Sequence, residues 1–564
     1  MGISRALARI DAIVVITLPF FVPSHRVRDR SDEQQMRRRL RQREEYRMPR
    51  RAKGRRQQQQ LPNPPQPPRI PNPNDRLLRS PLTGWLLSAH DIALGADAEQ
   101  EEKFMDSPQA SVSPIMRDLS EYIAHALHEP LSADVLETTK IHLVDTVAAM
   151  ISGSQLPPGQ RAIEYTRREG GSPDAGVVVS DFLTSAGAAA LANGIFAHAD
   201  ETDDVHTSTT THPGAAVVPA ALAMGERNGR SGQDVLRAIA LGYDVCGRHG
   251  RAMDLREMHR SGIAINNHSQ TFGAAAAAGA LMGLTAPGIR FVLSYAAEQA
   301  SGVPPFTRDT EHIQKAFGSG RAAQNGVAAA LMVASRFTGM EDVFSDASNY
   351  FEVYAPKADL THLTAGLGAD FEICQTSIKN WPTGGPTQAP LSLLQGLIRQ
   401  HGIIADQVER IVVRMAPLDV GIVDNSMMPN IGVQHLVALI LVDGTVSFDS
   451  AHDYSRISDP RVLDLRQRIE IVKTERMADA VRRWRAEVDL SLVDGRQFSE
   501  EVLAVKGSVQ NPMDREGESE KARALFTPVI GSDRGEELLA ALWDFDLLED
   551  VRELRSRLGS AARP

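Results

Sequence analysis

"HADETDDVHTSTTTHPGAAVVPAALAMGE", residues 198–226, joins a crowded polar segment to a run of small apolar residues. Its first seventeen residues hold three histidines and four acidic side chains. Pro213 then restricts the backbone and Gly214 permits a tight turn, and the alanines and valines that follow predict a buried helix. A polar loop anchored on such a helix holds its side chains rigidly, so this segment predicts a helical fold with a functional site at a helix start.

The helical pattern continues on both sides of this segment. Apolar residues recur at the interval of one helix face over residues 115–127. A second helix is predicted from Ser132, which is suited to an N-cap, to Gly153, which is suited to a stop. Residues 271–284, TFGAAAAAGALMGL, predict a core helix of small residues that lets neighbouring backbones approach closely. We therefore predict a large all-helical domain over residues 112–375.

The pattern changes near residue 376. Three segments alternate with period two, as strands do: residues 408–416, 468–472 and 487–505. Asp494-Gly495 is a strong signal for a hairpin turn. We predict a smaller α+β lid domain over residues 376–527 and, over residues 528–564, C-terminal helices that return to the helical domain. The predicted fold class is mainly α.

A basic, proline-rich segment precedes the helices. Between Arg26 and Arg56 there are 14 Lys and Arg residues against 5 Asp and Glu, a balance of +9, so the rest of the chain sums to −19 from the total of −10. The glutamine run and the prolines that follow are typical of a segment that buries little apolar surface. We predict a disordered extension over residues 1–111, and both a targeting role and an overlong predicted start remain open.

Bulk composition limits the class of protein. A length of 564 residues predicts more than one domain. Two cysteines, Cys246 and Cys374, exclude an iron–sulfur cluster of the usual ligand count and a disulfide framework, and they favour a reducing compartment. The apolar run at residues 13–22 is too short to span a bilayer. An acidic body also argues against nucleic acid as a partner, so we predict a cytoplasmic protein with neither membrane nor nucleic-acid contacts.

Three interpretations compete for the loop at residues 198–214. It binds a metal through its histidines and aspartates, it moves protons, or it is a solvated acidic loop that caps a helix. The histidine spacing matches no common zinc motif. The Pro213-Gly214 turn and the helix after it favour proton chemistry by His212, and no metal is predicted.

Several motifs in order resemble one known superfamily. "NGIFAHADETDD", "THPG", "VPAALAMGE", "HIQKAFGSGRAAQNG" and "SIKNWPTGGPTQAPL" are similar to the signatures of the MmgE/PrpD superfamily. This superfamily includes 2-methylcitrate dehydratase, cis-aconitate decarboxylase and iminodisuccinate epimerase. The resemblance covers about residues 112 to 560. It implies a helical domain with an α+β lid, a homodimer, no cofactor, and an active site in the cleft between the two domains.

The resemblance also assigns roles to individual residues. The catalytic roles fall on His212, Lys315, Lys379, His268 and Glu201. The substrate-binding roles fall on Asp204, Gln388, His435 and Trp381, and we add Arg321, whose guanidinium binds a carboxylate in a bidentate manner. The structural alternatives are a surface lysine at a helix start for Lys315, a loop lysine for Lys379, a buried structural histidine for His268, and an intramolecular salt bridge for Arg321.

This sequence departs from the family pattern at four positions. Glu201 stands where aspartate is usual, and Trp381 stands where tyrosine is common. Gln388 replaces a common histidine, and His435 falls where several members carry tyrosine. Recognition of the far end of the substrate therefore differs from that of other members.

The implied chemistry removes a proton next to a carboxylate. That step builds charge on an anionic group, so a lysine or protonated histidine must stabilise it and a histidine of ordinary pKa serves as base. We predict a cofactor-independent hydro-lyase, similar to 2-methylcitrate dehydratase, that acts on a small di- or tricarboxylate. The alternatives are a decarboxylase or epimerase on the same scaffold, and a catalytically inactive polycarboxylate-binding protein.

Overall fold

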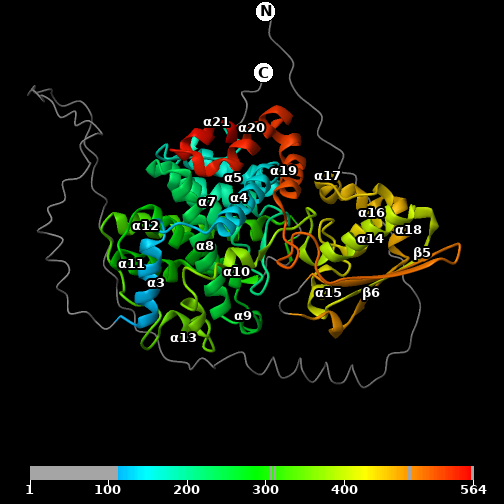
Figure 1. Ribbon diagram of the computed structural model, residues 1–564, viewed down its shortest axis with the longest axis horizontal. Helices are drawn as coiled ribbons and strands as arrows, with labels where there is room; N and C mark the ends of the chain where they lie inside the picture. The colour runs from blue at the N-terminus through cyan, green and yellow to red at the C-terminus, as the bar shows by residue number, and fades with distance from the viewer. Residues whose placement is uncertain (1–111, 305–307, 310, 480–483, 560–564) are drawn as a thin grey trace, which may run out of the picture. The chain divides into compact units, whose positions relative to one another are not determined.

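The computed structural model describes residues 112–304, 308–309, 311–479 and 484–559 (Figure 1). The predicted extension over residues 1–111 lies outside these residues. Among the described residues, no helix is both long and apolar enough to cross a membrane. Helices dominate, with one small mixed sheet, which confirms the predicted fold class of a large helical part with a smaller α+β part.

The helical part comes first along the chain. Its helices are α3 (Pro114–His125), α4 (Ala133–Gly153), α5 (Pro157–Glu169), α6 (Ala186–Ala197), α7 (Gly214–Asn228), α8 (Gly232–Ala252), α9 (Leu255–Ser261), α10 (Ile265–Leu281), α11 (Ala286–Gln299), α12 (Ile313–Ala334) and α13 (Tyr350–Tyr354). A two-residue pair, β1 (Ala175–Gly176) with β2 (Leu183–Thr184), lies between α5 and α6.

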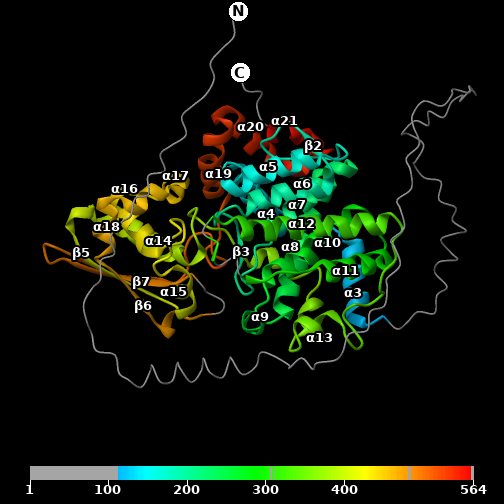
Figure 2. The ribbon, with the colours of Figure 1, turned by 180° about the vertical axis from the view of Figure 1, so that it is seen from behind.

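Local signals set these boundaries. The Ser132 side chain accepts a hydrogen bond from the Val135 amide at 3.4 Å, and α4 ends at Gly153, so both predicted ends of this helix are confirmed. The alanine-rich helix α10 is packed between α7, α8 and α12 (Figure 2). Small side chains allow these helices to approach closely, and this packing builds the floor on which the polar loop lies.

The last helices join the same core. They are α19 (Arg515–Ile530), α20 (Ser532–Trp543) and α21 (Arg555–Leu558). Phe526 of α19 and Leu538 of α20 are fully buried in the cluster that also contains Val147 of α4. Figures 1 and 2 both show these helices against α4 and α5. The C-terminal helices therefore pack on the same helical core as α4.

The α+β part holds a four-stranded sheet in the order β6-β5-β7-β8. Its strands are β5 (Val408–Met415), β6 (Ile469–Lys473), β7 (Ala486–Leu492) and β8 (Gln497–Val502), and its helices are α14 (Gln388–His401), α15 (Pro417–Val423), α16 (Val433–Asp443), α17 (Phe448–His452) and α18 (Pro460–Arg466). Strand β7 alternates buried and half-buried residues, and its buried face contributes to the core shared with α14 and α16. The hairpin predicted at Asp494-Gly495 joins β7 to β8, with Gly495 at φ +88°.

A second short strand pair connects the polar loop to the start of the α+β segment. β3 (Val205–His206) pairs antiparallel with β4 (Thr376–Ser377). The Thr207 and Ser377 hydroxyls lie 3.0 Å apart beside this pair. Because β3 lies inside the polar loop and Lys379 follows β4 by two residues, this pairing brings the loop and Lys379 together.

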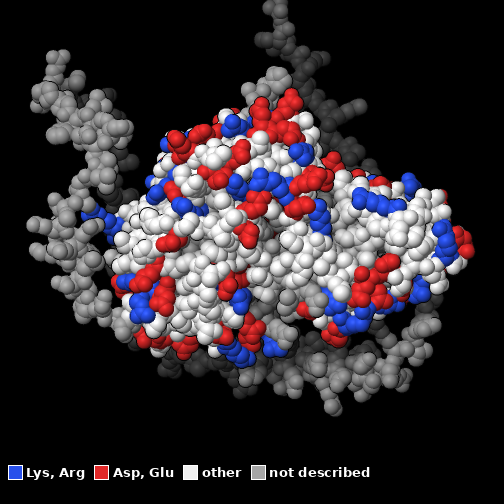
Figure 3. Space-filling view, in the orientation of Figure 1, with Lys and Arg blue, Asp and Glu red and all other residues white. Residues whose placement is uncertain are grey.

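Surface charges of both signs are interspersed on the face shown in Figure 3. Arg515 pairs with Glu137 at 2.6 Å, and Arg523 pairs with Glu536 at 2.6 Å, all four on the helical part. Exposed pairs of this kind contribute about 0–1 kcal/mol each, so packing rather than surface charge stabilises the fold.

A glycine contact between α6 and α12 provides a test of this packing. A Cβ atom at Gly320 would lie 2.6 Å from Ile195 Cγ1 and 2.9 Å from the Ile195 amide nitrogen, and it would also overlap the Leu191 carbonyl. We expect Gly320→Ala to lower the free energy of unfolding by about 1–3 kcal/mol, because α12 must move away from α6. Urea unfolding measures this change.

The matched control is Gly396, which lies within α14 and has no atom near its Cβ position. Gly396→Ala should raise the free energy of unfolding by about 0.5–1 kcal/mol through helix propensity alone. Equal effects of the two substitutions would contradict the close packing of α6 on α12.

Candidate active site

The loop between α6 and α7 is buried. Asp203 and Asp204 have no exposed surface, Asp200 is 1% exposed, and Glu201 is 7% exposed. Burial of an unpaired carboxylate is strongly unfavourable, so each of these groups needs a partner. The interpretation as a solvated acidic loop is therefore wrong.

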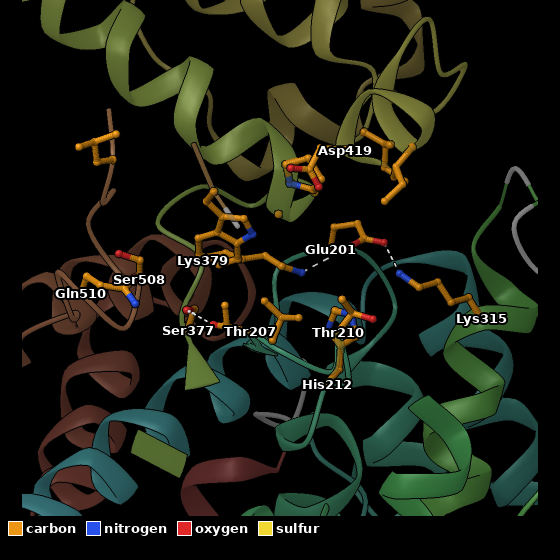
Figure 4. A pocket seen from close by; sticks show the side chains of 18 residues that line it. Glu201, Thr207, Thr210, His212, Lys315, Ser377, Lys379, Asp419, Ser508 and Gln510 are labelled. Carbon is orange, nitrogen blue, oxygen red and sulfur yellow. Dashed lines mark hydrogen bonds and ion pairs between the residues drawn. The ribbon is translucent and has the colours of Figure 1, made fainter. Parts of the chain in front are cut away.

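Glu201 is the meeting point of two lysines from distant segments. The Lys315 ammonium at the start of α12 forms an ion pair with Glu201 Oε1, and the Lys379 ammonium lies 3.4 Å from Oε2. Figure 4 shows the two lysines reaching this carboxylate from opposite sides. Burial alone would raise the pKa of Glu201, but the two lysines and His312 outweigh it and hold that pKa well below its usual range. Glu201 is therefore a carboxylate.

Lys379 is buried and remains a cation. Its side chain is 1% exposed, and its Nζ lies 3.5 Å from Asp203 Oδ1. Burial alone would lower the pKa of Lys379, yet Asp203 and Glu201 reverse the effect and raise it. The pocket thus has a fixed ammonium group at its floor.

Asp203 holds two histidines. Its Oδ2 lies 2.8 Å from His198 Nδ1 and 3.1 Å from His212 Nδ1, and the two rings are 4.6 Å apart between centroids. Burial opposes ionisation of Asp203, but His198, His212 and Lys379 keep its pKa well below the usual value. Burial lowers the pKa of His198 to about 3, so its ring is neutral near pH 7. Asp203 therefore hydrogen-bonds His198 and lies within ion-pair distance of His212 Nδ1, without a hydrogen bond to it.

Asp204 anchors the loop and does not line the pocket. It accepts hydrogen bonds from His142 at 2.9 Å, from the Tyr243 hydroxyl at 2.6 Å and from the Gly214 amide at 3.2 Å. A Cβ atom at Gly214 would lie 2.5 Å from the Tyr243 hydroxyl, so glycine is required for this close approach. The substrate-binding role predicted for Asp204 is thus replaced by a hold on the start of α7.

The α+β part also contacts this loop. His452, the last residue of α17, places Nε2 3.0 Å from Asp200 Oδ2. Burial alone would lower the pKa of His452, but Asp200 raises it. The same contact helps to lower the pKa of Asp200, against the effect of burial. This buried ion pair ties α17 to the floor of the site.

A cavity of about 170 Å³ opens over Glu201 (Figure 4). His212, Lys315 and Lys379 line it together with Glu201, so four of the five predicted catalytic residues meet there. Polar side chains from the loop and from the α+β segment complete this part of the wall: Thr207, Thr210, Ser377, Asp419, Ser508 and Gln510. The remaining lining residues are apolar or glycine.

His268, the fifth predicted catalytic residue, does not line this cavity. Its Nδ1 lies 2.8 Å from the Tyr350 hydroxyl, its ring packs edge-on against Tyr354, and burial lowers its pKa to about 4. The position of His268 around the axis of α10 explains why it does not line the cavity. Asn266 Oδ1 accepts from the His212 amide and Gln270 donates to the His212 carbonyl, so their face of α10 meets the loop. His268 lies about 200° around the helix from Asn266.

The other predicted substrate-binding residues also lie off this cavity. Arg321 is exposed, donates to Gln324 Oε1 at 2.6 Å and lines a separate cavity with Asn267 and Gln314. Gln388 is buried, and it accepts from the Trp381 amide and donates to the Trp381 carbonyl, so it fixes that turn. Trp381 packs in the core of the α+β part.

His435 is also buried in the α+β part, on α16, and both of its ring nitrogens are without a hydrogen-bond partner among the described residues. Burial, with Arg466 and Arg456 adding to it, lowers its pKa to about 4. A buried polar ring without partners is destabilising.

His312 is a site residue that the sequence analysis did not single out. It is 5% exposed, its Nε2 lies 3.0 Å from Glu201 Oε1, and it has φ +62°, the left-handed region that is unusual for histidine. It precedes Lys315 by three residues at the start of α12, and this spacing is the one sequence signal for its role. The backbone at His312 keeps this unusual conformation at the point where the His312 and Lys315 side chains both pair with the Glu201 carboxylate.

One group among the described residues has the geometry to hold a metal ion. Ligand atoms of His198, Asp203 and His212 lie within 4.8 Å of one another. Lys379 lies 3.5 Å from the other oxygen of the same aspartate, so a divalent ion there would face a neighbouring ammonium group. The arrangement of charge therefore favours proton chemistry over metal binding.

Two family domains cover most of the described chain. Residues 117–363 match the MmgE/PrpD N-terminal domain, and residues 381–546 match the MmgE/PrpD C-terminal domain. The chain belongs to the MmgE/PrpD family.

Its curated relatives match over most of their length. A cis-aconitate decarboxylase of Homo sapiens is 24% identical over 477 residues, which cover 80% of this chain and 96% of that protein. A cis-aconitate decarboxylase of Aspergillus terreus is 22% identical over 473 residues, with 78% and 95% covered. The cis-aconitate decarboxylase-like protein oryM of Aspergillus oryzae is 25% identical over 482 residues, with 79% and 97% covered.

The buried ring of His435 gives a testable pH dependence. Its pKa is about 4 in the folded chain and about 6.5 when unfolded, so the unfolded state binds more protons as the pH falls from 6.5 to 4 and stability is lost there. His435→Leu removes this loss. Between pH 7 and pH 5 the stability advantage of the variant over the parent should grow by up to about 2 kcal/mol.

Urea unfolding at several pH values measures this difference. Parallel pH profiles of the two proteins would show that His435 is not a buried neutral ring.

Proposed function

We propose that this protein is a cofactor-independent lyase that removes CO₂ from a small unsaturated carboxylic acid. The observation that carries the proposal is the convergence of Lys315, Lys379 and His212, from three separated segments, on one pocket around Glu201. Two cations with a histidine are what decarboxylation requires, because charge must be stabilised and a proton must be delivered.

The reaction balances without a co-reactant. The C–C bond to the departing carboxylate breaks, and its electron pair passes into the unsaturated acid as CO₂ leaves. The carboxylate that remains takes up the charge beside Lys379, which the neighbouring carboxylates keep protonated. A proton then adds to carbon, so that R–COO⁻ and H⁺ give R–H and CO₂.

His212 is the proposed proton donor. Its Nδ1 lies 3.1 Å from Asp203 Oδ2 and its ring packs on that of His198 at 4.6 Å between centroids, which leaves Nε2 to exchange a proton with the substrate. Lys315 and Lys379 bind the carboxylate that remains, and Glu201 sets the separation of the two ammonium groups. His198 lies against Asp203 and His212, and His312 pairs with Glu201. In this proposal both histidines position these groups and do not exchange a proton with the substrate.

The names of the relatives guide the order in which we rank the candidate reactions. The sequence analysis favours a hydro-lyase similar to 2-methylcitrate dehydratase, whereas the relatives described above carry the name cis-aconitate decarboxylase or a name derived from it. We therefore place decarboxylation first and keep dehydration as the second candidate, because base, acid and cation are the same for both. Epimerisation and binding without turnover are the remaining outcomes.

An NMR assay in D₂O separates these outcomes. The purified full chain is incubated with cis-aconitate, 2-methylcitrate, citrate and alkyl-substituted maleates. Decarboxylation gives CO₂ and one solvent deuteron on carbon, dehydration gives a new alkene without CO₂, and epimerisation exchanges one C–H while it inverts the centre. Water loss with no CO₂ from any acid would overturn the proposal in favour of the second candidate.

Loss of the proposed proton donor should abolish most turnover. We expect His212→Ala to lower kcat by at least about 10²-fold, the usual scale for an acid–base group. His128→Ala, at an exposed turn, is the matched control and should retain the parental rate. An unchanged rate for the His212 variant on the best substrate would remove this residue from the mechanism.

Chelation tests the alternative use of His198, Asp203 and His212 as metal ligands. We expect activity to survive exhaustive dialysis against EDTA, because Lys379 already compensates the charge of Asp203. Metal analysis of the dialysed protein accompanies the rate measurement. A complete loss of rate that zinc restores would establish a metal site in place of the proposed proton chemistry.

A further inference from the structure

A second cavity lies between the first turns of α10 and α12, apart from the cavity over Glu201. Its volume is also about 170 Å³, so it can hold a small organic molecule. Asn267 lines it from α10, Gln314 and Arg321 line it from α12, and Ser301 lines it from the segment after α11. The two cavities share no described lining residue, so the second is not part of the site proposed for catalysis.

Arg321 supplies this cavity with a cation. It donates a hydrogen bond to Gln324 Oε1 at 2.6 Å, and it forms no ion pair with the described residues. The adjoining stretch SGVPPFT, residues 301–307, contains no acidic residue. Asp309 follows it, and its carboxylate accepts from the Gln314 amide at 2.6 Å at the start of α12. The guanidinium has five N–H donors, so it retains donors for a ligand.

Three polar side chains of the same cavity form no hydrogen bond with the described residues: Asn267, Ser301 and Gln314. Ser301 and Gln314 are exposed, whereas Asn267 is half-buried and closely packed. A Cβ atom at Gly318 would lie 2.5 Å from Asn267 Nδ2, and a Cβ atom at Gly302 would lie 3.0 Å from the same nitrogen. The two glycines thus leave space in which the Asn267 amide offers donors and an acceptor to a ligand.

Apolar surface lies beside these polar groups. Phe317 is 50% exposed and Val303 is 59% exposed, and both line the cavity. A hydrocarbon group placed against them gains about 0.8 kcal/mol for each methylene that it buries fully. One guanidinium pairs with one carboxylate in a bidentate manner. The lining therefore fits a molecule with a carboxylate at one end and a short hydrocarbon group at the other.

We propose that this second cavity binds a small monocarboxylate. The carboxylate lies on the Arg321 guanidinium, with the side-chain amides of Asn267 and Gln314 as further donors, and the hydrocarbon group lies against Phe317 and Val303. The site is separate from the cavity to which we assign catalysis. The inference therefore does not depend on the reaction that the protein catalyses.

Titration of the full chain followed by ligand-observed NMR tests the class of ligand. Isovalerate should bind at least about tenfold more tightly than acetate, because it buries more hydrocarbon. It should also bind at least about tenfold more tightly than isovaleramide, which has nearly the same shape without the charge. Inorganic phosphate is the probe for anion binding alone. Binding of phosphate or isovaleramide as tight as that of isovalerate would overturn the proposed class.

Removal of the cation tests where the carboxylate lies. Arg321→Gln should weaken isovalerate binding by about tenfold or more, because a charge-assisted pair is lost. Arg321 is exposed, so the variant is expected to fold, and circular dichroism checks this. The matched control is Arg399→Gln, at an exposed position of α14 that lines neither cavity, and it should keep the parental affinity. Equal affinities of the Arg321 variant and the parent would place the carboxylate elsewhere and overturn the inference.

The position of the hydrocarbon group is tested by a pair of phenylalanines. Phe317→Ala should lower the ratio of isovalerate affinity to acetate affinity by about threefold or more, because apolar contact is lost only for the longer acid. Phe337→Ala is the matched control: Phe337 is 53% exposed and lines neither cavity, so the ratio should stay at the parental value. The same ratio in both variants and the parent would contradict the proposed orientation of the ligand.

Discussion

The buried ion cluster of Glu201, Asp203 and Lys379 is the constraint on which the site depends. An ammonium group as deeply buried as that of Lys379 is tolerated only beside carboxylates, and carboxylates as deeply buried as these need cations and imidazoles around them. The loop from α6 to α7 supplies the acids, and the segment after β4 supplies the lysine. The β3–β4 pairing holds these two segments side by side. The backbone itself therefore brings the Lys379 ammonium group close to the loop carboxylates.

The small residues of the helical core allow this loop to be buried. Gly194 and Gly320 bring α6 and α12 into backbone contact, and α12 carries both Lys315 and His312 at its start. Lys521 of α19 also contacts this loop, because it donates a hydrogen bond to the Thr202 carbonyl at 3.1 Å. Helices from the middle and from the C-terminal part of the described chain thus hold the same few loop residues. Substitution of a packing residue far from the pocket is therefore expected to change the distances between the charged groups in the pocket.

Local patterns in the sequence predicted the helices well, because caps and apolar spacing are properties of short segments. The ends of α4 and the hairpin at Asp494-Gly495 are examples. The resemblance selected His212, Lys315 and Lys379, which meet at the pocket, but it also selected His268, whose direction depends on the rotation of α10 against its neighbours. Long-range polar contacts cannot be read from short segments for the same reason: apart from its position three residues before Lys315, His312 has no neighbour in the chain that indicates Glu201, 111 positions earlier, as its partner.

The residues that line the pocket differ in how much stability their exchange would cost. The charged groups around Glu201 and Asp203 come from buried or half-buried positions, where removal of one partner of an ion pair leaves an uncompensated charge and lowers stability. Ile422 and Leu503 are half exposed and contact no member of the ion cluster through hydrogen bonds or ion pairs, so their exchange costs little stability. Selection on substrate therefore acts most easily on the wall from the α+β part.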